Sequence, residues 1–103
     1  MAYTERFIHN GWQYEWNKDK LAANLEKHGV HSELACEVFS DPNLLSVKDA
    51  SAWYGEIRHR HLGEVWLDET TALLVVVTTE RNDATRIISA RLAEPREIRW
   101  YRK

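Results

Sequence analysis

The feature of this sequence that most constrains its fold is the apolar stretch 72–77, which is rich in β-branched side chains. It is far shorter than the roughly 20 residues of a membrane-spanning helix, and its composition suits a strand at the centre of a sheet. It belongs to a series of four strand-like stretches after Pro42, at 43–47, 55–67, 72–80 and 85–92. Short polar segments separate the last three stretches, so we predict antiparallel neighbours joined by hairpins.

The N-terminal part of the chain predicts one strand and two helices. A strand is expected over 11–16, where alternate residues are aromatic, and a helix over 18–28, with Asn17 as its N-cap. A second helix is expected over 32–39 because its apolar residues recur at helical spacing, and a short third helix begins at Pro95.

This order of elements predicts an α+β fold, in which two N-terminal helices and a short C-terminal helix pack on an antiparallel sheet. The 103 residues match the usual size of one domain, so we treat residues 1–103 as a single domain.

Composition narrows the function classes. The net charge of −2 argues against a general binder of polyanions, and no membrane helix or targeting segment is recognisable, so a cytoplasmic protein is expected. Cys36 is the only cysteine, which excludes an internal disulfide. Because no histidine or second cysteine stands at ligand spacing from Cys36, a free structural thiol is expected there, and neither a metal site nor a cofactor is predicted.

The charges are unevenly distributed along the chain. Every arginine except Arg6 lies at or after Arg58, and basic side chains outnumber acidic ones from Arg81 to the C-terminus. Since the guanidinium fork matches phosphate well, this pattern favours a sheet face that binds phosphate. An ordinary solvated face, with each arginine paired to a nearby glutamate, explains the pattern equally well.

The densest group of titratable side chains lies at 56–61. Strand alternation places Arg58 and Arg60 on one face and His59 and His61 on the other, so the two pairs cannot all converge. The arginines are suited to phosphate, and the histidines to a proton transfer or, less plausibly, to a metal. If a helix covers the histidine face, both histidines are ordinary buried hydrogen-bonding residues.

A second arginine group surrounds the last hairpin, where Arg81, Arg86 and Arg91 are candidates for an anion site or for surface ion pairs. Among the remaining candidates, Lys27 is expected to point outward, and Trp53 and Tyr54 could stack on bases or contact a partner. For Trp12, Trp16 and Trp66, a place in the hydrophobic core is the favoured interpretation.

The chain resembles the BrnT family of type II toxins. The resemblance is carried by motifs from Tyr14 onward, of which the strings at 27–30 and 86–91 are the most specific; the others are Tyr14-Glu15-Trp16, Lys18, Lys20, Asn24, Val38-Phe39, Asp41-Pro42, Glu56, Arg58, Leu62-Gly63 and Thr79-Glu80-Arg81. The chain departs from the usual family pattern at the pair Ala50-Ser51, which replaces a usual His-Ser pair, and at Ile57, which replaces a second glutamate.

The resemblance implies a small RelE-like sandwich and a toxin that cleaves RNA, either free or on the ribosome, and inhibits translation. It also implies a BrnA-like antitoxin that neutralises the toxin in a hetero-oligomer. In a metal-free scheme the RNA 2′-hydroxyl attacks its own phosphate. Arg58, Arg81, Arg86 and Arg91 would then bind phosphate, His59, His61, Glu80 and Lys27 would be candidate proton carriers, and Lys27, Arg60, Trp53 and Tyr54 would contact RNA. The competing hypothesis is a non-catalytic module, or a decayed toxin, that binds RNA or protein through the same basic face.

Overall fold

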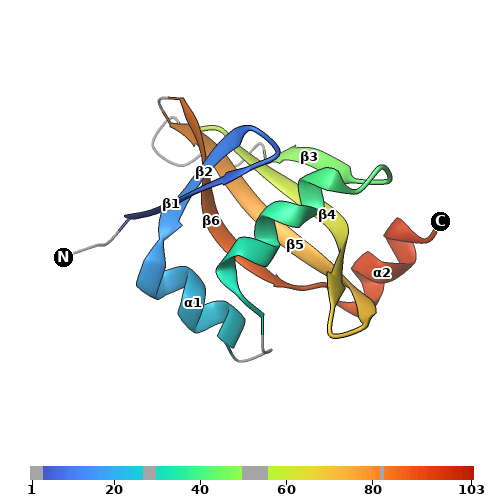
Figure 1. Cartoon of the computed structure of the whole chain (residues 1–103). Coiled ribbons are helices and arrows are strands. Elements are labelled where there is room, and N and C mark those ends of the chain that lie inside the picture. Colours follow the sequence, from blue (N-terminus) through green and yellow to red (C-terminus); the bar gives the residue numbers. More distant parts are fainter. Residues whose placement is uncertain (1–3, 27–29, 50–55, 82) are drawn as a thin grey trace.

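The computed structural model describes residues 4–26, 30–49, 56–81 and 83–103. These residues form one six-stranded sheet, in the order β1-β2-β6-β5-β4-β3, together with two α-helices and one 3-10 helix (Figure 1). The elements are β1 (Thr4–His9), β2 (Trp12–Asn17), α1 (Lys18–Glu26), η1 (Ser32–Ser40), β3 (Leu45–Asp49), β4 (Arg58–Leu67), β5 (Thr70–Arg81), β6 (Ala84–Leu92) and α2 (Pro95–Tyr101).

The predicted C-terminal strands are confirmed, with β5 between β4 and β6 and antiparallel to both. Asp68 and Glu69 form the turn between β4 and β5, and both have the positive φ angles that a tight two-residue hairpin requires. The predicted cap of α1 is also confirmed, because Asn17 Oδ1 accepts a hydrogen bond from the Lys20 backbone N–H at 2.9 Å.

The prediction of an antiparallel sheet is wrong at one position, because β2 pairs with β6 in parallel. β2 thus lies beside the last strand of the chain, which is distant from it in the sequence. A further strand, β1, pairs with β2 through a turn at Asn10 and Gly11, whose φ angles are 51° and 77°.

The prediction of two N-terminal α-helices is also wrong, because the second helix, η1, is a 3-10 helix. Its ends show the shorter bonding pattern, with Leu34 N–H donating to His31 O and Asp41 N–H donating to Val38 O. Cys36, expected from the sequence as a free thiol, lies in this helix and is completely buried.

Helices α1 and η1 lie on the same face of the sheet, in front of the strands in Figure 1, and we call this the covered face. Its core contains Trp16, Leu25, Val38, Leu74 and Ile87, all with no more than 1% exposure. Burial of this apolar surface is the main favourable contribution to folding.

The opposite face of the sheet, the open face, is covered only in part. Tyr101 of α2 packs there against Leu62, Leu73 and Val75. The Tyr101 hydroxyl also donates a hydrogen bond to Asp41 Oδ2 at 2.5 Å, which fixes the end of α2 against the segment that follows η1. Among the described residues, no helix is long and apolar enough to cross a membrane.

Two of the three tryptophans predicted for the core lie at the surface. Trp16 is fully buried, as predicted, whereas Trp12 is 54% exposed and Trp66 is 64% exposed. Trp12 shares the covered face with Trp16, but it lies at the other end of β2, beyond the part of the face that the α1 residues Leu21 and Leu25 cover.

Candidate functional site

The predicted site residues divide between the two faces of the sheet. Arg58 pairs with Thr79, and Thr79 pairs with Arg86, so the two arginines flank one threonine on the open face. His59 pairs with Thr78 on the covered face. The prediction that arginines and histidines of β4 occupy opposite faces is therefore confirmed.

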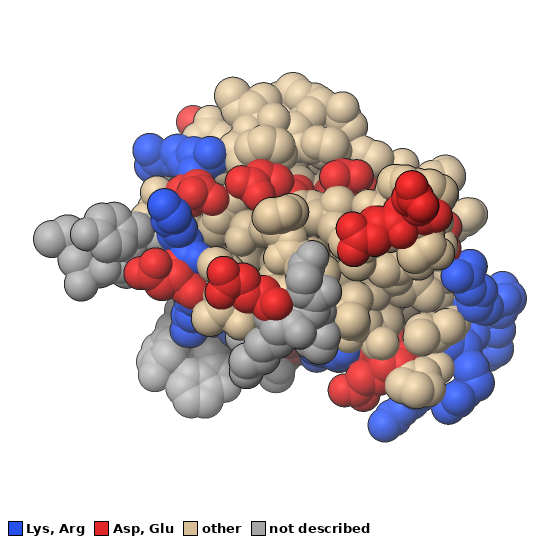
Figure 2. Space-filling model, turned by 60° about the horizontal axis from the view of Figure 1, so that its bottom comes forward, with Lys and Arg blue, Asp and Glu red and all other residues tan. Residues whose placement is uncertain are grey.

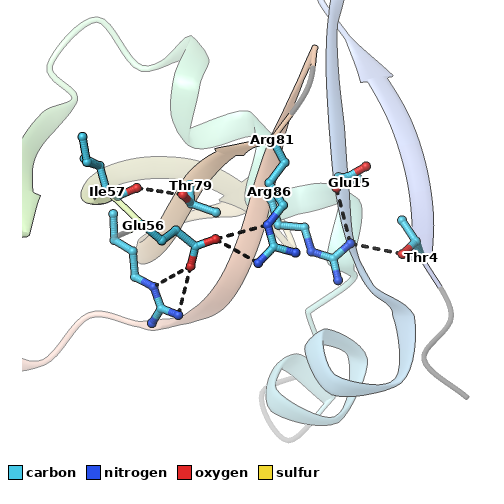
Figure 3. A network of polar contacts seen from close by, with 8 residues as sticks. Thr4, Glu15, Glu56, Ile57, Thr79, Arg81 and Arg86 are labelled. Atoms are coloured by element: carbon cyan, nitrogen blue, oxygen red, sulfur yellow. Dashed lines mark hydrogen bonds and ion pairs between the residues drawn. The ribbon is translucent and has the colours of Figure 1, made fainter. Parts of the chain in front are cut away.

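A carboxylate lies between two of the arginines on the open face. Glu56 Oε1 accepts hydrogen bonds from Arg81 Nη2 at 2.9 Å and Nε at 3.2 Å, and Glu56 Oε2 lies 3.4 Å from Arg58 Nε and Nη2 (Figure 3). The hydrogen bond from Arg81 is the main reason why the pKa of Glu56 is lowered from its usual value. The sequence analysis allowed a surface ion pair for Arg81, and the structure gives Glu56 as the partner.

Arg86 is held beside this pair by a different set of residues. Its Nη1 lies 3.5 Å from Glu15 Oε1 and 3.2 Å from Thr4 Oγ1, and its side chain is only 14% exposed (Figure 3). Arg6 lies on the other side of Glu15, at 3.7 Å. Because β1 and β2 supply all of these partners, the N-terminal hairpin that the sequence analysis did not predict helps to build the site.

The three arginines share a small cavity, which we call the arginine pocket. It has a volume of about 190 Å³ and is lined by Asn17, Lys20, Arg58, Arg81, Arg86, Ile87 and Ile88. Four of the lining side chains are basic, against the overall net charge of −2. A cavity of this composition is suited to an anion such as a phosphate group. Lys20 was not among the predicted site residues, although it comes one turn after the helix cap.

The histidines line a second cavity on the covered face, which we call the aromatic pocket. It has a volume of about 350 Å³ and is lined by Trp12, Tyr14, Phe39, His59, His61, Thr78, Glu80 and Thr85. Its rings contact one another: the Tyr14 and Phe39 centroids are 5.4 Å apart, and the Phe39 and His61 centroids are 4.7 Å apart. Planar groups therefore form the walls of this cavity.

Hydrogen bonds hold both nitrogens of His61. Nδ1 lies 2.7 Å from Ser46 Oγ, and Nε2 lies 2.9 Å from Thr78 Oγ1. Burial, and next the neighbouring His59, lowers the pKa of His61 to about 4, so this imidazole is neutral near pH 7. His61 is thus a hydrogen-bonded part of the wall of the aromatic pocket.

A third cavity, the junction pocket, lies where the two faces meet, at the start of β4 and the end of β5. It has a volume of about 340 Å³ and is lined by Glu56, Ile57, His59, Thr79 and Glu80. His59 and Glu80 line both this cavity and the aromatic pocket, while Glu56 belongs to the ion-pair network of Arg58 and Arg81. Side chains from opposite faces thus approach one another around this end of the sheet.

Two predicted arginines lie apart from these cavities. Arg91 makes a bidentate pair with Glu97 of α2, with both distances 2.8 Å, and lowers the pKa of Glu97 to about 2. Arg60 is exposed on the open face, near Glu97. Figure 2 shows basic side chains gathered at the margin where α2 lies, with basic and acidic groups interspersed over the rest of that view.

Several predicted positions lie outside the described residues. They are Lys27, Trp53 and Tyr54, proposed for RNA contact, and the departures at Ala50 and Ser51. Within the described ranges, no group of three histidine, cysteine, aspartate or glutamate side chains is arranged so that it could hold a metal ion.

Comparison with known proteins gives one positive finding. A family model described as the ribonuclease toxin BrnT of type II toxin–antitoxin systems matches residues 16–97, from the end of β2 to the first turn of α2. This range includes the described lining residues of the arginine and junction pockets, whereas Trp12 and Tyr14 of the aromatic pocket precede it. A search of the curated proteins found no match. The match covers most of the chain and agrees with the resemblance carried by the sequence motifs. The chain therefore belongs to the BrnT family of ribonuclease toxins of type II toxin–antitoxin systems.

Proposed function

We propose that this toxin is a metal-independent endoribonuclease in which the arginine pocket binds the phosphate to be cleaved and the junction pocket carries out the proton transfers. The observation that carries the proposal is the pair of arginines, Arg58 and Arg81, that share the carboxylate of Glu56 beside a cavity lined by His59. Positive charge, a carboxylate and an imidazole lie at one end of the sheet, and these are the groups that RNA cleavage by its own 2′-hydroxyl requires.

The proposed reaction is balanced without a protein nucleophile. Glu56 takes the proton of the 2′-hydroxyl, whose oxygen forms a bond to phosphorus while the bond from phosphorus to the 5′-oxygen breaks. His59 gives a proton to the leaving 5′-oxygen. The products are a 2′,3′-cyclic phosphate and a 5′-hydroxyl end. Arg58 and Arg81 stabilise the negative charge that develops on the phosphate oxygens.

The ion pairs of Glu56 in the free protein are compatible with the proposed proton transfers. Arg58 and Arg81 now donate to Glu56, and these contacts are the reason why the pKa of its carboxyl is low. A phosphate that binds the same guanidinium groups competes with Glu56 for them, so the carboxylate loses hydrogen bonds and becomes a stronger base. Substrate binding would therefore activate the base at the moment when it is needed.

Substitution of Arg81 tests the proposal. The Arg81→Ala variant should cleave RNA about 100–1,000-fold more slowly than the wild type, because it loses a donor to the transition state. The Arg81 side chain is 49% exposed, so the variant should remain folded. Arg99→Ala is the matched control, since it removes the same charge from an exposed position on α2 and should cleave normally.

Product chemistry separates the proposal from its competitor. Cleaved RNA should carry 2′,3′-cyclic phosphate ends, and a substrate with a single 2′-deoxyribose at the cleaved nucleotide should stay intact. If purified wild-type protein binds RNA and leaves it uncut, the competing hypothesis of a non-catalytic binding module replaces the ribonuclease scheme. Ends without the cyclic phosphate would refute attack by the 2′-hydroxyl.

We also propose that expression of the toxin stops translation and that a BrnA-like antitoxin neutralises it by forming a hetero-oligomer. The family assignment supports an antitoxin partner. Growth arrest on expression of the toxin alone, and its relief by co-expression of such an antitoxin, would be the expected result. Failure of the two chains to co-purify would contradict the proposed complex.

A further inference from the structure

We infer that the aromatic pocket binds a guanine base of the RNA substrate and that Glu80 recognises it through the Watson–Crick edge. This inference rests on the proposed ribonuclease function, because it assigns a base to the nucleotide next to the cleaved phosphate. It gives Glu80 a role in base recognition in place of the proton-carrier role considered from the sequence.

Aromatic rings form the walls of the pocket, and one of them is a prepared stacking surface. Trp12 is 54% exposed in spite of its size, so its ring is accessible. Its orientation is nevertheless fixed, because Trp12 Nε1 donates a hydrogen bond to Thr85 Oγ1 at 2.7 Å. An accessible ring held in one orientation loses little conformational freedom when a base stacks on it.

The size of the pocket suits a single base. Its volume of about 350 Å³ lies near the lower end of the roughly 300–1,000 Å³ that is usual for ligand pockets. Phe39 and His61 meet edge to face at 4.7 Å and close one wall, and hydrogen bonds to Ser46 and Thr78 hold His61 in place. The pocket is therefore small and preformed, which favours a flat ring system over a long flexible ligand.

The polar groups of the pocket select among the bases. Glu80 is the only carboxylate among the described residues that line it. Glu80 Oε1 accepts a hydrogen bond from the Thr85 hydroxyl at 3.0 Å, and Oε2 has no hydrogen bond or ion pair with any described residue. Arg81, the next residue, points to the opposite face and pairs with Glu56. Glu80 Oε2 is thus available to a ligand.

A carboxylate accepts hydrogen bonds but cannot donate them. Guanine presents two adjacent donors on its Watson–Crick edge, the N1–H and the 2-amino group, and can therefore pair with both carboxylate oxygens. Adenine and cytosine each place an acceptor nitrogen beside their amino group, and uracil places its one N–H between two carbonyl groups. Guanine is therefore the base that fits Glu80 best.

The position of the pocket connects the base to the chemistry. His59 and Glu80 line both the aromatic pocket and the junction pocket, where Glu56 lies. A base held by Glu80 on the covered face therefore brings its own ribose and phosphate to the end of the sheet. From there the phosphate can reach Arg58 and Arg81 on the open face.

Two measurements test the inference. The first compares cleavage of short RNAs that contain one guanosine, or inosine in its place, in an otherwise uridine sequence. Inosine lacks the 2-amino group, so wild-type cleavage at that position should fall about 10–100-fold. In Glu80→Gln the two substrates should be cut at similar rates, because the amide offers one acceptor and one donor. Glu33→Gln, an exposed substitution on η1, should behave like the wild type.

The second measurement needs no cleavage. Calorimetric titration with the nucleosides guanosine, inosine and adenosine should give the strongest binding for guanosine, and Glu80→Gln should remove that preference. Trp12→Ala should weaken guanosine binding about 5–100-fold through lost stacking, and Trp12→Phe should restore most of it. Nucleosides carry no phosphate, so binding in the arginine pocket does not contribute.

The outcomes distinguish the inference from the proposed function. If the protein cuts no RNA but still prefers guanosine through Glu80, the ribonuclease scheme fails and the base pocket stands. If the protein cuts RNA without regard to guanine, and guanosine binds no better than adenosine, the base pocket is refuted. A guanine preference that persists unchanged in Glu80→Gln also refutes it, because another residue must then read the base.

Discussion

The packing of η1 on β4 leads to a quantitative prediction at Gly63. A Cβ atom at this position would lie 2.7 Å from Val38 Cβ and 2.9 Å from the Val38 carbonyl oxygen. Carbon atoms in ordinary contact are about 3.5–4.0 Å apart, so η1 would have to move away from the sheet by about 1 Å. Neither contact atom is the end of a flexible side chain. We therefore expect Gly63→Ala to lower the free energy of unfolding by about 1–3 kcal/mol.

Urea denaturation, followed by circular dichroism, measures this change. Each kcal/mol should also lower the melting temperature by roughly 4–8 °C in a domain of this size. Leu44→Ala removes only the third contact, at 3.1 Å, so adding it to Gly63→Ala should restore little stability. Gly11→Asn is a control in an open environment, and it should cost less than about 1 kcal/mol because asparagine tolerates a positive φ. If Gly63→Ala unfolds within about 0.5 kcal/mol of the wild type, the close contact between η1 and β4 is not real.

Two pH-dependent predictions follow from the shifted groups. The pKa of His61 is lowered to about 4, so its contribution to stability is complete above about pH 6.5, where the unfolded chain also loses its proton, and it disappears as the pH falls toward 4. Urea unfolding should show this loss in the wild type, up to about 3 kcal/mol, and a smaller loss in His61→Gln; equal pH profiles would contradict a neutral His61. The pKa of Glu97 is lowered to about 2 by Arg91, so its contribution should persist above about pH 4.5 and disappear as the pH falls through 2. In Arg91→Met, an NMR titration of the Glu97 carboxyl should return its pKa toward 4.5, and an unchanged value would refute the ion pair as the cause.

Local signals account for the parts of the fold that the sequence predicted. Alternation and turn chemistry are properties of a few neighbouring residues, and they identified the β4–β5–β6 hairpins, the cap at Asn17 and the helix that begins at Pro95. The same kind of signal was available for β1, because Asn10-Gly11 is a favoured hairpin turn. The strand predicted over 11–16 instead included the glycine of that turn.

The parts that were wrong depend on packing between distant segments. Neither β2 nor β6 has the continuous apolar run that is typical of strands in a parallel sheet, so their parallel pairing could not be predicted from the sequence. The 3-10 geometry of η1 could not be predicted either, since the spacing of its apolar residues also suits an α-helix. Trp12 was expected in the core because an aromatic residue on a strand is usually buried, and the structure instead places it beside a cavity.

The candidate site likewise combines features that local sequence signals predict with features that depend on distant contacts. Alternation along β4 correctly separated the arginines from the histidines, but only the register of three strands reveals that Arg58 and Arg86 flank Thr79. From the sequence, Arg81 and Arg91 were equal candidates for an anion site or an ion pair. In the structure, Arg81 shares Glu56 with Arg58, while Arg91 pairs with Glu97 of α2. Which glutamate pairs with which arginine depends on tertiary contacts, so composition alone could not assign it.

The division of the site between two faces has a consequence for how such a toxin would discriminate among RNAs. On the proposed mechanism, arginines on the open face would bind any phosphate, and their affinity would be moderated because Glu56 and Glu15 form ion pairs with them in the free protein. A base on the covered face would meet Glu80, which would discriminate among bases by their hydrogen-bond pattern. The proposed cleavage requires one nucleotide to contact both faces of the sheet, at the start of β4 and the end of β5. RNA lacking the preferred base can then bind through its phosphates without placing its 2′-hydroxyl beside Glu56, so selectivity arises in the cleavage step more than in binding.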